Sequence, residues 1–89
     1  MKNSIIYHVR GIGLSLRHAN LIIFFFENYG KNEIPLSYRK IANTMGYSYV
    51  SAGEYLKDLE AKGLITAGGT DKKRTYKLNI ELLEGLLRG

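Results

Sequence analysis

The chain has 89 residues, of which 45% are apolar and 24% are charged. This length allows one domain with one modest core, and the composition excludes a disordered chain. The absence of cysteine excludes a disulfide framework and fits a reducing cytoplasm. Thirteen lysines and arginines against eight aspartates and glutamates give a net charge of +5, so polyanions are the first partners to test.

No segment predicts a membrane anchor or a signal peptide. The longest apolar run, LIIFFF at 21–26, is far shorter than the roughly 20 residues that cross a bilayer. The start of the chain lacks a basic stretch followed by a long apolar region. We therefore expect a cytoplasmic protein with no membrane partner.

The first ten residues alternate between apolar and polar side chains. Ile5, Tyr7 and Val9 fall on one side of an extended chain, which predicts a half-buried strand. After a break at GIG, Ser15 is the expected N-cap of a helix that ends near Gly30. Apolar residues recur at helical spacing along this helix and predict a face turned to the core. The members of this face are Ala19, Ile22, Ile23, Phe26 and Tyr29.

The same helix carries a second apolar face, made by Leu21, Phe24 and Phe25. A monomer of this size has little left to cover that face, so we expect a second copy of the chain to cover it. Cover by the amino-terminal strand within one chain is the alternative. The expected dimer interface combines this face with both ends of the chain. Its residues are Ile5, Tyr7, Leu21, Phe24, Phe25, Leu83 and Leu87.

Two helices joined by a tight turn are predicted in the middle of the chain. Ser37 is the expected N-cap of a short helix over 38–44, which Gly46 ends. Ser48 is the expected N-cap of a longer helix, which Gly63 ends. The apolar residues of both helices are spaced for burial on one face. They are Ile41, Ala42, Ala52, Tyr55, Leu56 and Leu59.

A hairpin and a final helix complete the predicted elements. Residues 64–68 and 75–80 predict the two arms of the hairpin, and 69–74 predict its loop. Residues 80–89 predict a short amphipathic helix. No repeat or linker indicates a second domain, so we expect one domain over 1–89.

This order of elements resembles the winged helix-turn-helix superfamily from Ser15 to Asn79. The resemblance rests on IPLSYRKIANTMGYS, which matches the first helix and turn, and on YLKDLEAKGLI, which matches the end of the recognition helix. More narrowly, the chain resembles MarR-like repressors and the helix-turn-helix domains of plasmid and phage replication or partition proteins. The expected fold class is α+β and mainly helical, with a three-helix core, a β-hairpin wing, an amino-terminal strand and a carboxy-terminal helix.

In the superfamily, the start of the recognition helix touches DNA bases. The resemblance therefore implies base contacts by Tyr49, Val50, Ser51, Gly53 and Glu54. Glu54 repels phosphate, but a carboxylate in the major groove can accept a hydrogen bond from the N4 amine of cytosine. Contacts to the DNA backbone are expected from serines at helix starts and from cations beside the reading helix. These residues are Ser37, Arg39, Lys40, Ser48, Lys57, Lys72, Lys73 and Arg74.

The expected function is sequence-specific binding of double-stranded DNA by a homodimer whose reading helices lie about 34 Å apart. The role would be that of a transcriptional regulator, or of a replication or partition protein of a mobile element. A winged helix that docks a protein without specific DNA binding is the alternative.

We expect no enzyme, cofactor or metal. The two histidines, His8 and His18, lie in different predicted elements, with no evident nucleophile beside either. No glycine-rich phosphate-binding motif is present.

Overall fold

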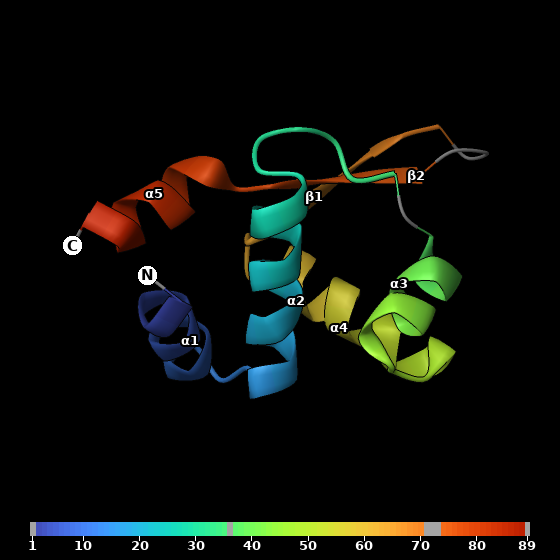
Figure 1. The fold of residues 1–89 in the computed structure, drawn as a ribbon, viewed down its shortest axis with the longest axis horizontal. Coiled ribbons are helices and arrows are strands. Elements are labelled where there is room, and N and C mark those ends of the chain that lie inside the picture. Colours follow the sequence, from blue (N-terminus) through green and yellow to red (C-terminus); the bar gives the residue numbers. More distant parts are fainter. Residues whose placement is uncertain (1, 36, 71–73, 89) are drawn as a thin grey trace.

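The most apolar segment of the chain forms the central helix of the structure. The computed structural model describes residues 2–35, 37–70 and 74–88. Helix α2 lies in the middle, with α1 and α5 to one side, α3 and α4 to the other, and a hairpin above (Figure 1). The elements in chain order are α1 (Lys2–Gly11), α2 (Leu16–Asn28), α3 (Tyr38–Met45), α4 (Tyr49–Ala61), β1 (Ile65–Gly69), β2 (Arg74–Leu78) and α5 (Ile80–Arg88).

The amino-terminal segment is a helix, and the strand predicted from its alternating pattern is wrong. Ile5 and Val9 lie one helical turn apart and are both buried, with 3% and 1% of their surface exposed. Ile12 continues this spacing and packs against the core. Tyr7, expected on the same side as Ile5 and Val9, is 83% exposed. Apolar residues at 5 and 9 fit both periods, and packing of the segment along α2 selects the helix.

Both apolar faces of α2 are covered within one chain. Leu21, Ile22 and Phe25 have no exposed surface. Helix α1 packs along α2, while α4 and β2 meet it from other directions. Phe24 is half-buried against the same core. The predicted partner-facing surface is therefore wrong at Leu21 and Phe25, because the chain's own helices close over them.

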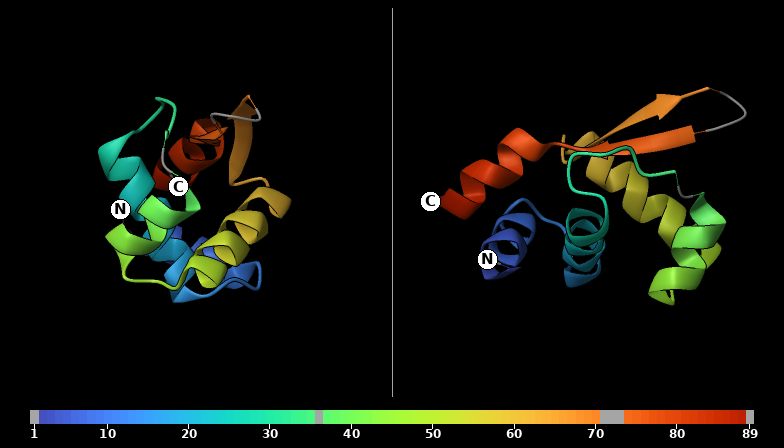
Figure 2. Two further views of the ribbon diagram at one scale, coloured as in Figure 1. Left: turned by 90° about the vertical axis from the view of Figure 1, so that its right-hand side faces the viewer. Right: turned by 45° about the horizontal axis from the view of Figure 1, so that its top comes forward.

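Helix α5 packs against α1 at the end of the molecule where both termini lie (Figures 1 and 2). Leu83 has no exposed surface, and Ile5 is buried, so these two residues belong to the core and not to a dimer interface. The side chain of Leu87 lies outside the part of the structure that is described. Helix α3 lies toward the opposite end of the molecule, whose longest extent is 38 Å (Figure 1).

The two middle helices start and stop where the sequence predicts. The hydroxyls of Ser37 and Ser48 each accept the backbone N–H three residues further on, at 3.3 and 3.1 Å. Gly46 ends α3 with a φ of 74°, in the left-handed region that favours glycine. The apolar residues predicted to be buried are in the core, except that Tyr55 is half-buried. This pair of helices is the helix-turn-helix that the pattern predicts.

The hairpin also pairs with a residue outside its two strands, and the sequence did not predict this pairing. Strands β1 and β2 pair antiparallel, with Ile65 opposite Leu78. Ile34 forms a bridge to Tyr76 on the other edge of β2, with N–H to carbonyl distances of 2.7 and 3.0 Å. Ile34 itself has no exposed surface. The base of the hairpin is therefore fixed to the segment that leads into α3.

Gly53 lies inside α4 at its contact with α3. A side-chain carbon at this position would come within 3.2 Å of two ring atoms of Tyr38. Glycine in a helix costs about 1 kcal/mol relative to alanine, and the close approach of Tyr38 gives the physical reason for it here. Gly53 is buried, so the base contact predicted at this residue is corrected: it is a packing residue.

We expect Gly53→Val to lower the free energy of unfolding by about 1–3 kcal/mol, because the new side chain must displace the ring of Tyr38. Glu54→Val places the same side chain one residue further on, at an exposed position, and is expected to change stability by less than about 0.5 kcal/mol. Urea unfolding followed by circular dichroism measures both. Equal losses in the two variants would show that β-branching sets the cost and that the contact with Tyr38 does not.

Candidate nucleic-acid interface

The first turns of α4 present an exposed face beside α3 and the hairpin. Tyr49 and Val50 expose 58% and 67% of their surface, and Glu54 is also exposed. Ser51 is half-buried, and its backbone N–H is held by the Ser48 cap. Four of the five predicted base-contact residues thus have surface on this side of α4. The first positive charge after the helix starts is the exposed Lys57, two turns along.

Three tyrosines connect the hairpin to the front of α4. The ring of Tyr38, the first residue of α3, stacks on Tyr76 of β2 with a centroid distance of 6.5 Å and an interplanar angle of 19°. Its centroid also lies 6.1 Å from that of Tyr49, with an interplanar angle of 60°. Burial, together with the hydrogen bond to Tyr38, raises the pKa of Tyr76. The ring of Tyr38 therefore touches three elements and sets how they sit against one another.

A cavity of about 470 Å³ opens between these elements. Its lining residues are Ser37, Tyr38, Arg39, Tyr49, Arg74 and Tyr76. Arg39 comes from the first turn of α3, and Arg74 begins β2. Both arginines are exposed, and none of the lining residues is acidic. The arrangement offers hydrogen-bond donors and positive charge to an anion.

The predicted backbone-contact residues that the structure describes are all exposed: Ser37, Arg39, Lys40, Ser48, Lys57 and Arg74. Lys72 and Lys73 lie outside the described residues. The cavity brings Ser37 and Arg39, which the sequence assigned to one helix, together with Arg74, which it assigned to the hairpin. Their convergence depends on the pairing of β2 with Ile34, which the sequence pattern does not reveal.

His18 is a buried polar residue for which the sequence predicted no role. Its Nδ1 accepts the backbone N–H of Ser15 at 3.0 Å and lies 2.7 Å from the Ser15 hydroxyl. Its Nε2 lies 2.9 Å from a carboxylate oxygen of Asp58 on α4. An acceptor at Nδ1 places the ring proton on Nε2, which donates to Asp58; the tautomer is inferred from these bonds. His18 thus ties the start of α2 to α4.

Serine, histidine and aspartate in a row also form the catalytic group of many hydrolases. Here the backbone N–H of Ser15 already donates to the Nδ1 atom that faces the hydroxyl, so this nitrogen is not free to act as a base. The group caps a helix and joins two helices. The spacing of Ser15 and His18 resembles a capping box and could have been noticed, whereas Asp58 lies 40 residues away and could not.

The turn between α3 and α4 is anchored to α2 by a second polar group. The hydroxyl of Tyr47 donates to the carbonyl of Arg17 at 3.1 Å, and the Arg17 guanidinium lies 5.8 Å from the centre of the Tyr47 ring. Arg17 also donates to the hydroxyl of Tyr55 at 3.2 Å. Burial raises the pKa of Tyr47. Together with His18, these contacts hold the helix-turn-helix on α2.

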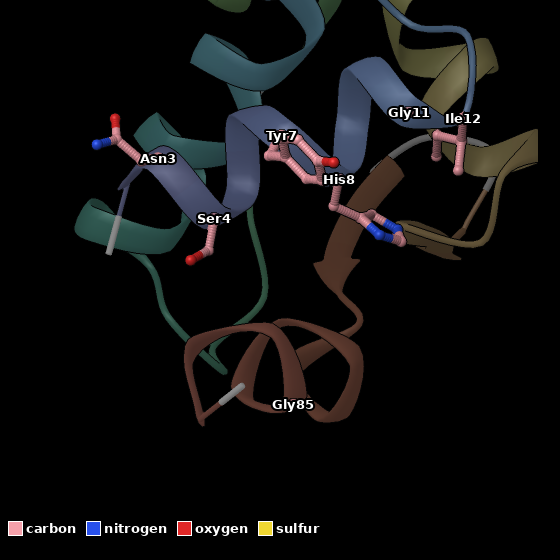
Figure 3. A pocket seen from close by; sticks show the side chains of 7 residues that line it. All are labelled: Asn3, Ser4, Tyr7, His8, Gly11, Ile12 and Gly85. Atoms are coloured by element: carbon pink, nitrogen blue, oxygen red, sulfur yellow. The ribbon is translucent and has the colours of Figure 1, made fainter.

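A second groove lies at the other end of the molecule, between α1 and α5. Figure 3 shows α1 along one side of this groove and α5, at Gly85, along the other. The cavity has a volume of about 780 Å³ and is lined by Asn3, Ser4, Tyr7, His8, Gly11, Ile12 and Gly85. A neighbouring cavity of about 490 Å³ is lined by Asn3, Ile6, Tyr7, Arg10 and Gly11. The exposed Tyr7 therefore borders both hollows.

The described residues, which are 2–35, 37–70 and 74–88, contain neither a metal-binding cluster nor a membrane-spanning helix. In these ranges, no three His, Cys, Asp or Glu side chains gather as a metal would require. None of the helices in the described part is both long and apolar enough to pass through a bilayer.

Comparison with protein-family models and with curated proteins finds no match. Solved structures share the fold. MepR, the transcription regulator of the Staphylococcus aureus multidrug efflux pump MepA, matches with a TM-score of 0.68 and 15% identity over 98% of this chain and 65% of MepR. A MepR–DNA complex matches with a TM-score of 0.66 and 13% identity, covering 99% of this chain and 76% of that one.

The MarR repressor of Listeria monocytogenes also matches, with a TM-score of 0.67 and 16% identity over 97% of this chain and 56% of the repressor. The chain thus spans 65% and 56% of MepR and of this MarR repressor. The shared property at these identities is the fold. The chain has the winged-helix fold found in MarR-family regulators, as its sequence predicts apart from the amino-terminal strand.

Proposed function

We propose that this chain is a DNA-binding transcriptional regulator whose helix α4 enters the major groove. The observation that carries the proposal is the surface at one end of the molecule, where the exposed front of α4 lies beside a cavity lined by Arg39 and Arg74. A major groove about 12 Å wide admits a helix, and phosphates flank the groove on both sides. A similar fold has been solved in complex with DNA in MepR. The proposal places the reading face and the cations on the same side of the molecule.

Bases are read by the residues with surface on the front of α4. Val50 offers an apolar contact for a thymine methyl group, while Tyr49 and Ser51 offer hydroxyls. Glu54 accepts from the N4 amine of cytosine, which is the base-edge donor that suits a carboxylate. Because this face is nearly without positive charge, the attraction to phosphate comes from α3, from Lys57 and from the wing, whose loop includes Lys72 and Lys73 in the sequence.

We expect Lys72→Glu with Lys73→Glu to weaken binding to double-stranded DNA by at least about 100-fold at low salt and to lower the salt dependence, because up to two phosphate contacts are lost. The matched control is Lys31→Glu with Lys62→Glu, which changes the net charge equally. Lys62 lies at the far end of α4, about 20 Å from Tyr49 at 1.5 Å per residue. Mobility shifts over a salt series measure both.

Equal weakening by the two charge reversals would show attraction by net charge alone and would remove the wing contact. A wild-type chain that retards no DNA at modest salt would contradict the proposal as a whole. That result would favour the alternative in which the exposed Tyr49 and Val50 dock on a protein. A replication or partition role would use the same DNA contacts and stays a second prediction from the sequence.

A homodimer formed through α1 and α5 is part of the proposal. Tyr7 is the most exposed large apolar side chain among the described residues and borders two hollows. Helix α1 carries Lys2, His8 and Arg10 and no acidic residue, while α5 carries Glu81 and Glu84 against a single cation, Arg88. A two-fold pairing places the basic helix of each copy near the acidic helix of the other. This surface replaces the predicted one on α2, which is buried.

We expect Tyr7→Glu to weaken the dimer by about 30-fold or more, as truncation or charging of a central aromatic does in many interfaces. Leu16→Glu is the control, because Leu16 is also an exposed apolar residue, at 50%, but lies at the start of α2 and lines neither hollow. Sedimentation velocity measures the mass of each. A wild-type chain that sediments as a monomer, or equal effects of the two variants, would contradict this dimer.

A further inference from the structure

We propose that the cavity between α3, the front of α4 and β2 seats a single phosphate of the bound DNA, held by Arg39 and Arg74 together. This inference rests on the proposed DNA-binding function and makes it more specific. The sequence treats the two arginines as separate backbone contacts, 35 positions apart. In the structure they line the same cavity of about 470 Å³.

The chemistry of the lining suits a phosphodiester. Two guanidinium groups, three phenols and one serine hydroxyl line the cavity. The phenols of Tyr38 and Tyr76 hydrogen-bond to each other, while the two guanidinium groups, the Tyr49 phenol and the Ser37 hydroxyl can donate to a ligand. A phosphodiester carries one negative charge and accepts hydrogen bonds at its oxygens, and arginine binds it with two parallel N–H groups. The hydroxyl of Ser37 accepts the backbone N–H of Lys40, which leaves its own proton to donate. Among the described residues, those that line the cavity include no acidic side chain.

Tyr38 is the positioning residue of this site. Its ring lies against Gly53 of α4, where a side-chain carbon would come within 3.2 Å. The same ring stacks on Tyr76, next but one to Arg74 on β2, and it is the neighbour of Arg39 on α3. Tyr38 therefore fixes the distance between the two arginines without needing to touch the phosphate. It also fixes the positions of both arginines relative to Tyr49, at the start of the reading helix.

A shared phosphate has a consequence that two separate contacts do not have. Because one DNA group is gripped from α3 and from the wing at once, the depth and angle of α4 in the groove are set at this point. Loss of either arginine then disrupts the binding of the same phosphate. The second loss adds little to the first, so the two substitutions are strongly coupled.

The test is a double-mutant cycle of Arg39→Ala and Arg74→Ala on DNA affinity, with a salt series for each variant. Each single change is expected to weaken binding about tenfold or more and to lower the salt slope by about 1. The double variant is expected to bind within about threefold of the weaker single one, with no further drop in slope. Losses that multiply, together with a slope lowered by about 2, would show two separate phosphates and overturn the inference.

The same cycle in a Tyr38→Leu background tests the positioning residue. The coupling is expected to disappear there and to persist with Tyr38→Phe, which keeps the ring; circular dichroism checks that both variants are folded. Coupling that survives Tyr38→Leu would remove the role of Tyr38. A wild-type chain that binds no double-stranded DNA would remove the proposed function, whereas DNA binding with uncoupled arginines would remove the shared phosphate alone.

Discussion

The close approach of α3 to α4 at Gly53 is the constraint on which the proposed DNA-binding end of the molecule depends. Without a side chain at this position, the ring of Tyr38 can lie against α4. The ring then lies close to the rings of both Tyr76 and Tyr49. The absence of a side chain at Gly53 thus lets the ring of Tyr38 set the positions of α3, α4 and β2 relative to one another. A glycine that is unfavourable for helix stability is explained by this packing.

Behind that contact, polar groups hold α4 on the central helix. His18 links Ser15 to Asp58, and Tyr47 anchors the turn to the backbone of Arg17. His18 is buried and both of its ring nitrogens have partners, so a shift of α4 that separates it from Asp58 leaves a buried donor unpaired. The front of α4 can then lack positive charge, since its orientation does not depend on contacts with a ligand.

Local chemistry allowed the middle of the chain to be predicted from sequence. Serine caps, the stop at Gly46 and the apolar spacing around Ile41 and Leu56 are properties of neighbouring residues, and each is confirmed. The strand predicted at the amino terminus was wrong because apolar residues at 5 and 9 fit both the two-residue period of a strand and the turn of a helix. Only packing on α2 decides between the two. The burial of Phe25 likewise depends on helices that are distant in the sequence.

The candidate site likewise has one part that local sequence patterns predict and another that depends on contacts between distant residues. The exposure of Tyr49, Val50 and Glu54 follows from the periodicity of α4, whereas burial of Gly53 depends on where Tyr38 lies. The convergence of Arg39 and Arg74 requires the bridge between Ile34 and β2, a pairing that involves a single residue and leaves no pattern in the sequence. Long-range contacts of this kind were therefore outside the reach of spacing arguments.

The central claim is that the front of α4 reads base pairs, with Glu54 as a reading residue. Selection of bound fragments from a pool of random double-stranded DNA, carried out with the wild-type chain and with Glu54→Ala, tests it most directly. We expect the wild type to enrich one motif and Glu54→Ala to lose the preference at one base pair while the rest of the motif persists. A uniform gain in affinity of Glu54→Ala for all sequences, or a wild type that enriches no motif, would contradict it.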